Sequence, residues 1–322
     1  MKAIVQDRYG SADVLEFRDV PRPVAGEDDV LVHVVAAGVD RGAWHSMTGQ
    51  PFLMRLLGFG LRAPRSPVPG RNIAGRVESA GDRVTGFRPG DEVYGTTEGA
   101  YAEYARAAVG KIAPKPRNLS FAQAAVTPYA GFAALQALRD VGRLTPGEDV
   151  LIVGASGAVG SATIQLAKAF GARVTAVCSG ANTDFVLDLG ADEVIDYTVG
   201  DFSRGAERFD LVVDIGGRTS VARLRRRLRP HGRLVIIGGE GDRWIGGIQR
   251  QLWAVVVSFC VRQRLSSFVA RENARDLLEL NKLIEAGQFE PHVARMYPLA
   301  EAADAMRQLD VAHHRGRIAV TV

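Results

Sequence analysis

The stretch from Asp149 to Tyr197 constrains this chain most, because it has the pattern of a complete βαβαβ unit. Residues 150–153 form a short apolar run bounded by turn residues, which is typical of a strand buried on both faces of a parallel sheet. A helical apolar pattern follows, and later segments predict a strand over 173–178, a helix over 182–189 and a strand over 193–195. This order of elements predicts a doubly wound α/β sheet.

A glycine-rich turn, GASGAVG at residues 154–160, joins the first predicted strand to the first helix. In a dinucleotide-binding turn, one glycine permits a tight bend, one lets the backbone approach a pyrophosphate, and one lets the helix pack against the strand. Gly157 and Gly160 fit the last two roles. Ala155 replaces the first glycine of the G-x-G-x-x-G pattern, and Gly154 offers the flexibility one residue earlier. We therefore predict dinucleotide binding at the helix N-terminus; the alternative is that the glycines only shape a loop.

The residues after the second predicted strand indicate which dinucleotide binds. A protein selective for NAD(H) usually places an Asp or Glu about 20 residues after the glycines, where it repels a 2′-phosphate. Residues 178–183 read CSGANT, which is neutral, and Asp184 is the first acid there. We therefore expect NADP(H), although this loop also lacks a Lys or Arg that would attract the phosphate.

Two later strands are also predicted to end in glycine. The segments 209–214 and 233–237 have strand patterns and are followed by small residues. Ligands of doubly wound sheets lie at the carboxyl ends of the strands, where glycines let backbone amides approach closely. We therefore expect Ile215, Gly238 and Gly239 to contact the nicotinamide end of the cofactor, unless these glycines are plain turn residues.

The composition is that of an ordinary globular enzyme. The chain has 322 residues, of which 47% are hydrophobic and 24% are charged, and this length suffices for two domains. The net charge is only +4, and the dense basic run RLRRRLR at 223–229 is interpreted as the exposed face and end of a helix stopped by Pro230. We expect no nucleic-acid partner, because the basic residues are not gathered on one element.

Cysteine usage and apolar segments bear on location. The two cysteines, Cys178 and Cys260, predict neither a disulfide framework nor a cysteine-rich zinc site, and residues 1–10 lack the apolar core of a secretory signal. We therefore expect a cytoplasmic protein. The apolar segment 252–261 is too short to span a bilayer, so stable membrane insertion is not expected. Within 244–268, a homodimer contact or a core helix is favoured over association with a membrane surface.

The remaining segments predict a second, β-rich domain. Short strands separated by Gly and Pro turns are predicted at 2–5, 14–20 and 30–35, which suits a compact barrel-like domain. Near residue 115 the composition changes, and the capping box SFAQ at 120–123 introduces an Ala-rich helix. A final strand at 316–322 is expected to return to the first domain.

Several motifs in combination resemble the medium-chain dehydrogenase/reductase superfamily. They are the glycine-rich unit with LGADEVIDY after it, RPGDEVYG before it, and PLAEAADAMRQL and RGRIAVTV near the C-terminus, and the likeness covers nearly the whole chain. The chain is most similar to the zinc-independent, quinone oxidoreductase-like branch. This resemblance implies a GroES-like catalytic domain over 1–118, completed by 295–322, a Rossmann NADP(H)-binding domain over 119–294, and a cofactor in the cleft between them.

The resemblance also implies that no metal is bound. Zinc-dependent relatives carry a Cys in the first cleft loop and a Gly-His-Glu motif, and the matching positions here read VDR at 39–41 and GRN at 70–72. Neither contains a thiolate, and residues 95–110 hold no Cys or His for a structural zinc. Without a Lewis acid, the expected substrates are small apolar electrophiles such as quinones and enones, whose carbonyl spreads the charge of an incoming hydride.

The family's cofactor contacts match a set of residues in this sequence. The resemblance assigns them to Thr127, Ser156, Gly157, Ala158, Val159, Gly160, Ser179, Asn182, Tyr197 and Arg317. The residues from Ser156 to Gly160 would hold the pyrophosphate, and Ser179, Asn182 and Tyr197 would surround the adenosine ribose and its 2′-phosphate. The family's cleft loop often reads Asn-Pro-x-Asp, and DRGA at 40–43 replaces it. Asp40 is therefore a candidate that stabilises the oxidised nicotinamide ring or pairs with Arg41.

His45 is the second candidate catalytic side chain, because its ordinary pKa suits a general acid. A lone His beside Trp is also a common packed or surface residue. An apolar pocket is expected from Trp44, Met47, Phe52, Phe59, Trp244 and Trp253, although core packing explains each of them equally well. The sequence thus predicts an NADPH-dependent quinone or enone reductase. The alternatives are a zinc-free alcohol or aldehyde oxidoreductase and a non-catalytic NADPH-binding protein.

Overall fold

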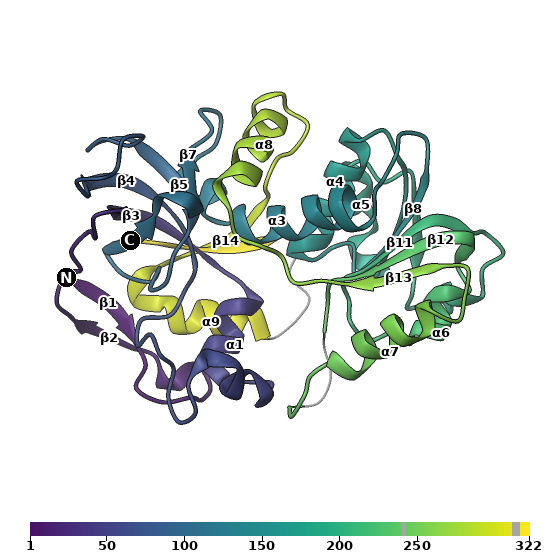
Figure 1. Cartoon of the computed structure of the whole chain (residues 1–322), viewed down its shortest axis with the longest axis horizontal. Helices are drawn as coiled ribbons and strands as arrows, with labels where there is room; N and C mark the ends of the chain where they lie inside the picture. The colour runs from purple at the N-terminus through teal and green to yellow at the C-terminus, as the bar shows by residue number, and fades with distance from the viewer. Residues whose placement is uncertain (240–242, 311–315) are drawn as a thin grey trace. The chain divides into compact units, whose positions relative to one another are not determined.

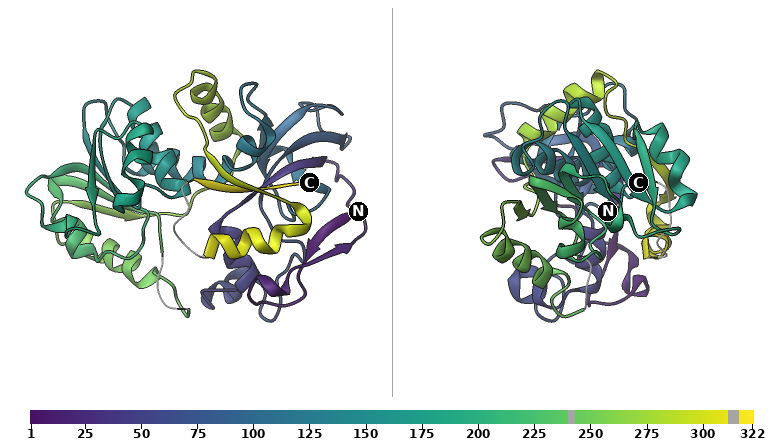
Figure 2. Two further views of the ribbon diagram at one scale, coloured as in Figure 1. Left: turned by 180° about the vertical axis from the view of Figure 1, so that it is seen from behind. Right: turned by 90° about the vertical axis from the view of Figure 1, so that its right-hand side faces the viewer.

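The computed structural model describes residues 1–239, 243–310 and 316–322. Its contacts divide the chain into two compact units. Unit 1 comprises Met1–Tyr129, Glu272–Ala286 and Pro291–Val322, and unit 2 comprises Ala130–Arg271 and Gly287–Glu290. Figure 1 labels the elements of both units, and Figure 2 shows the same elements from two further sides.

Unit 2 contains the parallel sheet that the glycine-rich segment predicts. Its strands are β8 (Asp149–Val153), β9 (Arg173–Cys178), β10 (Glu193–Asp196), β11 (Phe209–Asp214), β12 (Leu228–Ile236) and β13 (Arg264–Ser267). They lie in the order β10-β9-β8-β11-β12-β13, and every neighbouring pair is parallel. Numbered along the chain, this order is 3-2-1-4-5-6, which is that of a dinucleotide-binding doubly wound sheet.

Helices cover both faces of this sheet. They are α4 (Ala158–Ala169), α5 (Thr183–Asp188), α6 (Val221–Arg225) and α7 (Ile248–Ser258), and α3 (Pro128–Gln136) precedes the first strand. Figure 1 shows α4 and α5 on one face and α6 and α7 on the other. Under α6 and α7, Leu224 and Ala254 join a buried apolar cluster with the strand residues Val212 and Leu234. Burial on both faces explains why the strands of this unit are continuous apolar runs.

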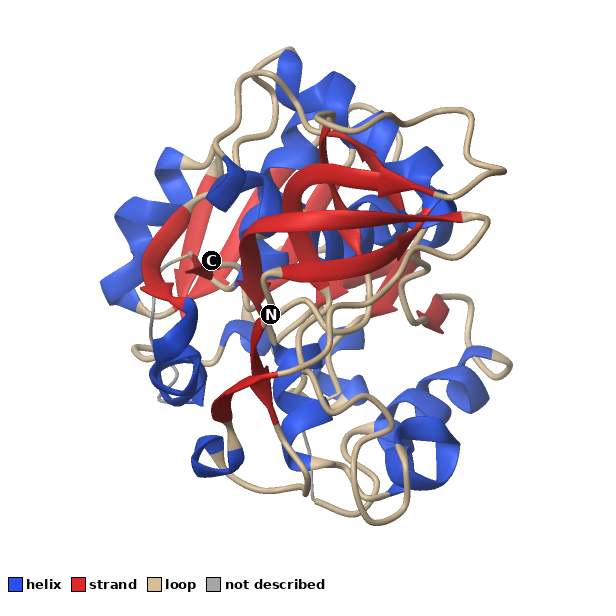
Figure 3. Cartoon of the chain, turned by 90° about the vertical axis from the view of Figure 1, so that its left-hand side faces the viewer, coloured by secondary structure: helices blue, strands red, loops and turns tan. Residues whose placement is uncertain are grey.

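Unit 1 is built mainly from β-strands. They are β1 (Lys2–Val5), β2 (Glu16–Asp19), β3 (Asp29–Val39), β4 (Asn72–Ala80), β5 (Glu92–Thr96), β6 (Tyr104–Ala108), β7 (Ile112–Pro114), β14 (Val293–Pro298) and β15 (Arg317–Thr321). The larger sheet has the order β14-β15-β3-β4-β5-β7, with β6 also paired to β3, while β1 and β2 pair separately. Figure 3 draws the strands in red. The final strand therefore joins this unit, and the predicted fold class is confirmed.

Among the described residues, the α-helices that accompany these strands are α1 (Arg41–Thr48), α2 (Phe121–Ala125), α8 (Ala274–Glu285) and α9 (Ala302–Asp310). Two of them change the expected domain ranges, because α2 and α8 belong to unit 1 and not to the unit with the parallel sheet. The Tyr94 hydroxyl of β5 donates to the backbone oxygen of Leu277 in α8 at 3.1 Å. The side chain of Asn118 donates to the backbone oxygen of Ile284 at 2.8 Å. These bonds attach α8 to the β-rich unit.

The basic run at 223–229 is not the exposed helix end that its sequence suggests. Helix α6 ends at Arg225, and Pro230 lies inside β12, because Leu228 pairs with Phe209 of β11. Arg227 is only 1% exposed, its guanidinium bonds to the backbone oxygen of Phe202, and it stacks on the Phe209 ring. The run therefore contains a buried structural cation, which a helical reading of this segment misses.

Helix α7 presents its apolar side chains to the surface of unit 2. Leu252, Trp253 and Val256 are 62%, 60% and 55% exposed, and Phe259 just beyond the helix is 87% exposed. Only Ala254 of this helix is buried. The expectation of a core helix is therefore wrong for most of its length. Within the described residues, no helix is both long and apolar enough to span a bilayer.

Candidate active site

The glycine turn of unit 2 has the geometry of an anion-binding loop. Gly154 has φ +86°, and a Cβ there would lie 2.8 Å from the backbone nitrogen of Gly216, so this position favours glycine. A Cβ on Gly160 would overlap the carbonyl oxygen of Gly154. A Cβ on Gly157 would make only an ordinary contact of 3.7 Å. The tight packing thus occurs at Gly154 and Gly160, and Gly157 leaves room above the turn.

The N-terminus of α4 lies directly after the glycine turn. Gly157 is the N-cap residue, and no side chain caps the helix. The N–H groups of Val159 and Gly160 belong to the first turn, where backbone N–H groups have no intrahelical acceptor. The helix dipole adds a partial positive charge at the same place. Three of the predicted pyrophosphate residues therefore sit at a helix N-terminus that suits an anion.

Asn182 brings three of the predicted cofactor residues together. Its Nδ2 donates to the Ser156 hydroxyl at 3.3 Å and to the Ser179 hydroxyl at 3.1 Å. Tyr197 follows β10, its N–H donates to the Cys178 carbonyl at 3.1 Å, and its side chain is 51% exposed. These residues lie at the carboxyl ends of β8, β9 and β10, as the doubly wound pattern requires.

An acidic side chain that the sequence reasoning missed lies in the same region. Asp196 ends β10, and a Cβ on Gly180 would collide with its carboxylate. The carboxylate accepts the Thr198 hydroxyl at 2.6 Å and the Thr198 N–H at 2.8 Å. These hydrogen bonds lower the pKa of Asp196 below its ordinary value. The acid that selects NAD(H) usually follows the second strand, whereas Asp196 lies at the end of the third strand, β10.

The loops after β11 and β12 touch each other. A Cβ on Gly238 would overlap the carbonyl oxygen of Ile215, so the two predicted residues are in direct backbone contact. Gly239 is close to α7, because a Cβ there would lie 3.0 Å from the side-chain nitrogen of Gln251. The glycines at these strand ends therefore allow the two loops to pack closely against each other. The predicted contact of these loops with a ligand stays a prediction.

A buried ion pair supports these loops. Asp214, the last residue of β11, is fully buried and pairs with Arg250 of α7. Arg250 also donates to the carbonyl oxygens of Thr219 at 2.8 Å and Gly238 at 2.7 Å. Burial raises the pKa of Asp214, and the positive charge of Arg250 opposes that rise. The two residues are 36 positions apart, so no local pattern in the sequence indicates the pair.

In unit 1, Asp40 is the N-cap of α1 and the centre of a polar network. Its carboxylate accepts the N–H of Ala43 at 2.8 Å and the side-chain amide of Asn72 at 2.5 Å. The Asn72 oxygen in turn accepts the N–H of Tyr129 at 3.3 Å. Burial raises the pKa of Asp40, while the Ala43 N–H, the charge of Arg71 and the Asn72 amide oppose that rise. The Arg41 guanidinium lies over the Trp44 ring, 4.9 Å from its centroid.

Arg71 belongs to a second charged cluster of unit 1. Its Nε and Nη2 donate to one oxygen of Glu272 at 3.1 and 2.7 Å, and Lys111 donates to the other oxygen at 2.9 Å. Burial alone would raise the pKa of Glu272, but Lys111 and Arg71 together hold it below its ordinary value. Glu272 thus fixes the side chain of Arg71 next to the Asp40 network.

Two other predicted cofactor residues are buried in unit 1. The Thr127 hydroxyl donates to the carbonyl oxygen of Gln123 at 2.7 Å, within its own helical segment. Arg317 opens β15, is 3% exposed, and donates from Nη1 to the Val126 carbonyl at 3.3 Å. Burial lowers the pKa of Arg317 to about 10. The predicted contacts of both residues with a cofactor stay predictions.

His45 lies in the last turn of α1. Its Nδ1 is 2.6 Å from the carbonyl oxygen of Gln50, and its ring meets the edge of Trp44 at 5.2 Å between centroids. Nδ1 of His45 thus contacts the backbone at Gln50, just after the end of α1. The role of His45 as a general acid stays a prediction.

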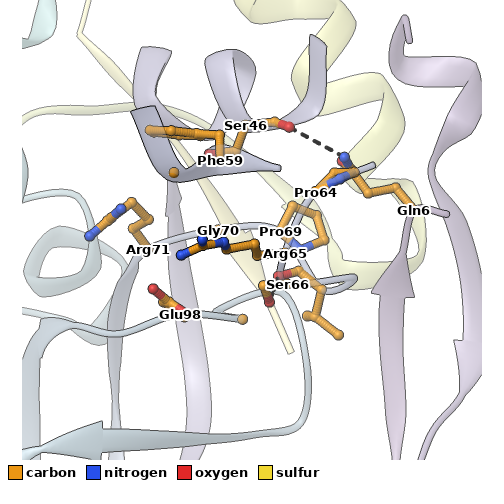
Figure 4. Close-up of a pocket in the computed structure, with 13 residues that line it drawn as sticks. Gln6, Ser46, Phe59, Pro64, Arg65, Ser66, Pro69, Gly70, Arg71 and Glu98 are labelled. Carbon is orange, nitrogen blue, oxygen red and sulfur yellow. Dashed lines mark hydrogen bonds between the residues drawn. The ribbon is translucent and has the colours of Figure 1, made fainter. Parts of the chain in front are cut away.

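A pocket of about 260 Å³ opens in unit 1 beside these residues. Figure 4 shows its lining, which combines apolar residues such as Phe59 and Pro64 with the polar side chains of Gln6, Arg65, Arg71 and Glu98. Of the six residues expected to form an apolar pocket, Phe59 lines this one. Met47 lies in the core, and Trp244 and Trp253 are exposed on unit 2.

Comparison with known proteins identifies the family. Residues 26–117 match the alcohol dehydrogenase GroES-like domain, and residues 189–320 match the zinc-binding dehydrogenase family. A 2-methylene-furan-3-one reductase from Solanum lycopersicum is 32% identical over 338 residues, which covers 99% of this chain and 79% of that protein. The chain belongs to the medium-chain dehydrogenase/reductase superfamily.

Solved structures place the chain in the quinone oxidoreductase-like branch of this superfamily. A quinone oxidoreductase from Coxiella burnetii has a TM-score of 0.89 and 30% identity, and the match covers 100% of this chain and 99% of that one. An NAD-dependent alcohol dehydrogenase has a TM-score of 0.86 and 29% identity, with both chains fully covered. The predicted family and branch are confirmed, and this medium-chain dehydrogenase/reductase is an oxidoreductase that uses a nicotinamide cofactor.

The second matching family is named for zinc, so the arrangement of possible metal ligands in this chain is relevant. The part of the chain that the structure describes contains no group of three or more His, Cys, Asp or Glu side chains arranged to hold a metal ion. The matching loop positions of this medium-chain dehydrogenase/reductase are occupied by Asp40, Arg71 and Asn72, which bond to one another or to Glu272. The absence of zinc stays a prediction.

Proposed function

We propose that this protein is a zinc-independent, NADPH-dependent reductase of quinones or α,β-unsaturated carbonyl compounds. The observation that carries the proposal is the uncapped N-terminus of α4, with Ser156, Asn182 and Ser179 joined beside it. Backbone donors and neutral hydroxyl and amide groups at this position suit the pyrophosphate and the phosphorylated ribose of the cofactor. The reductase names of the Solanum lycopersicum and Coxiella burnetii relatives support the substrate class.

The preference for NADPH rests on the charges around the end of β9. The loop directly after this strand is neutral, which removes the usual repulsion of a 2′-phosphate. Asp196 is the nearby acid, and its oxygens are already engaged by Thr198 and the Gly180 backbone. We propose that this engagement keeps the carboxylate from selecting the unphosphorylated ribose.

The residues of the chain bind and orient the cofactor and the substrate, and the cofactor supplies the hydride when it is bound. The residues Ala158, Val159 and Gly160 would hold the pyrophosphate, and Ile215 and Gly238 would present backbone groups at the strand ends. A quinone or enone accepts the hydride at carbon, and its carbonyl oxygen carries the resulting negative charge. Water then gives the proton that completes the reduction, so no protein acid is compulsory. His45 is the side chain that we propose for assisting this proton transfer, and we propose that the carboxylate of Asp40 stabilises the oxidised nicotinamide ring.

A zinc-free alcohol or aldehyde oxidoreductase is the second candidate. The similarity to an NAD-dependent alcohol dehydrogenase favours it, since the name of that protein gives both a different substrate class and a different cofactor. Such an enzyme would reduce isolated carbonyls and would leave conjugated C=C bonds untouched.

Titration of the protein's fluorescence with NADPH and NADH, followed by oxidation assays at 340 nm, tests the proposal. We expect tighter binding of NADPH and turnover with a quinone and an enone, with weaker turnover of an aldehyde. The variant D196N should leave the ratio of the NADPH and NADH affinities close to that of the parent, because Thr198 and the Gly180 backbone already engage the carboxylate. Aldehyde turnover alone would favour the second candidate. Tight binding with no turnover of any of the three would favour a non-catalytic NADPH-binding protein.

A further inference from the structure

The pocket of unit 1 contains a cation that is not neutralised by the protein. Arg65 lines the pocket, and within the described residues its guanidinium makes no ion pair. Arg71 lines the same pocket, and its bonds to Glu272 use Nε and Nη2, which leaves the two donors of Nη1 outside that contact. Figure 4 shows both arginine side chains around the same hollow, with Glu98 among its other lining residues.

We infer that Arg65 and Arg71 bind a carboxylate of the substrate, so that the electrophile reduced by this protein is a small unsaturated carbonyl compound that carries an acid group. The inference rests on the proposed function and narrows its substrate class. A planar guanidinium matches the two oxygens of a carboxylate and is the side chain best suited to bind one.

The size of the pocket favours a small acid. Its volume of about 260 Å³ lies below the roughly 300–1,000 Å³ typical of sites for drug-sized ligands. Phe59, Pro64 and Pro69 supply apolar contacts for the carbon skeleton. A compound with a short carbon chain or a single ring, an enone and one carboxylate fits this mixture of surfaces.

The loop that carries Arg65 is held in place by the rest of unit 1. The N–H of Arg65 donates to the Phe59 carbonyl at 3.0 Å. The Tyr9 hydroxyl donates to the carbonyl oxygens of Phe59 and Gly60 at 2.9 and 2.8 Å. The Arg55 guanidinium lies over the rings of Tyr9 and Phe52 and bonds to the Gly49 carbonyl at 2.9 Å. Arg65 is thus presented on a loop whose backbone is already bonded before a ligand arrives.

Glu98 should oppose the binding of an acid in this pocket. Its carboxylate lines the same pocket and repels an anion that enters. Replacing it with an uncharged residue should therefore strengthen the binding of an acid, whereas replacing Arg65 should weaken it. A merely structural role for both residues would not give opposite effects that depend on the charge of the ligand.

The test compares trans-4-oxopent-2-enoate with its methyl ester, since the two enones differ in charge at one end. With NADPH, we expect the parent protein to have a kcat/KM for the acid at least tenfold that for the ester. R65Q should raise the KM for the acid about tenfold and affect the ester less, E98Q should lower the KM for the acid, and R62Q on the same loop should change neither. Equal or better turnover of the ester by the parent would overturn the inference and leave the proposed function intact.

A binding measurement separates this inference from the proposed function. Levulinate, the saturated acid, should bind the parent protein in ligand-observed NMR and should lose affinity in R65Q but not in R62Q. Levulinate binding that is the same in all three proteins would overturn the inference. Failure of both enones and of a quinone to oxidise NADPH or NADH would instead overturn the proposed function.

Discussion

The side-chain amide of Asn72 donates to the carboxylate of Asp40 at 2.5 Å, and its oxygen accepts the backbone N–H of Tyr129. One amide group therefore joins the start of α1 to the start of α3. Because Asp40 is also the N-cap of α1, the pair links a buried carboxylate to two chain segments of unit 1. Removal of this pair should therefore lower the free energy of unfolding more clearly than it lowers the rate of reduction.

We expect D40A to destabilise unit 1 by about 1–3 kcal/mol, because it removes a helix cap and leaves the Asn72 amide without its acceptor. D40N removes the buried charge and keeps one side-chain oxygen, whereas the Ala43 N–H and the Asn72 amide bind to two different oxygens of Asp40. It should therefore lose less stability than D40A, because it keeps one of the two hydrogen bonds. Urea unfolding of the three proteins at pH 7 checks this, and equal losses in D40A and D40N would show that the charge itself is needed.

The glycines of the turn should separate folding from cofactor binding. A Cβ on Gly160 overlaps the Gly154 carbonyl, so G160A should cost about 1–3 kcal/mol of stability, as overpacking does. A Cβ on Gly157 has room, so G157A should fold normally and weaken NADPH by blocking close approach of the pyrophosphate. Thermal unfolding and fluorescence titration measure the two effects. An unchanged NADPH affinity in G157A would contradict the assignment of this turn.

Arg250 should be important for the stability of unit 2. R250A leaves the buried carboxylate of Asp214 without its partner, which typically costs about 3–5 kcal/mol. The double variant D214N/R250A should recover part of this loss, because it removes the unpaired charge. Q249A, on the exposed side of the same helix, serves as the control. Denaturant unfolding gives the free energies, and a double variant no more stable than R250A would show that the charge of Asp214 is not the cause.

Glu272 should make stability depend on pH in the acid range. Its folded pKa is held below the ordinary value of 4.5, so its ion pairs stabilise the folded state fully above that value. The contribution is lost as the pH falls through the lower folded pKa. E272Q should therefore be less stable than the parent at pH 7, and the difference should shrink towards pH 3. Unfolding free energies at several pH values check this, and a constant difference would exclude the linkage.

The parallel sheet could be predicted from the sequence because its signals are local. The strand at 173–178 has the bounds that its apolar run indicates, and the capping box at Ser120 and Gln123 is present as expected. Helix α1 is not evident from the sequence, because it is only eight residues long and contains Gly42, so its apolar residues show little helical periodicity. Its start also depends on the cap at Asp40. Local sequence patterns therefore sufficed to predict the parallel sheet of unit 2 but not helix α1 of unit 1.

The candidate site was predictable only in part. Ser156, Ser179 and Asn182 meet as the family pattern implies, since each follows a neighbouring parallel strand. The Arg250–Asp214 pair and the contact of Asp196 with Gly180 join residues from separate elements. Such pairings depend on which strands become neighbours in the sheet. The local patterns of a single sequence do not show the order of the strands.

The bond between Asn72 and Asp40 also limits the order in which these two positions can change during evolution. Exchanging the acid and the amide requires two substitutions. A chain that first acquired Asp at position 72 would set two buried carboxylates against each other and lose the donor that joins them. A chain that first acquired Asn at position 40 would keep one of the two hydrogen bonds that Asp40 accepts, and it would bury no second carboxylate. Lineages that reverse this pair should therefore pass through an intermediate with amides at both positions.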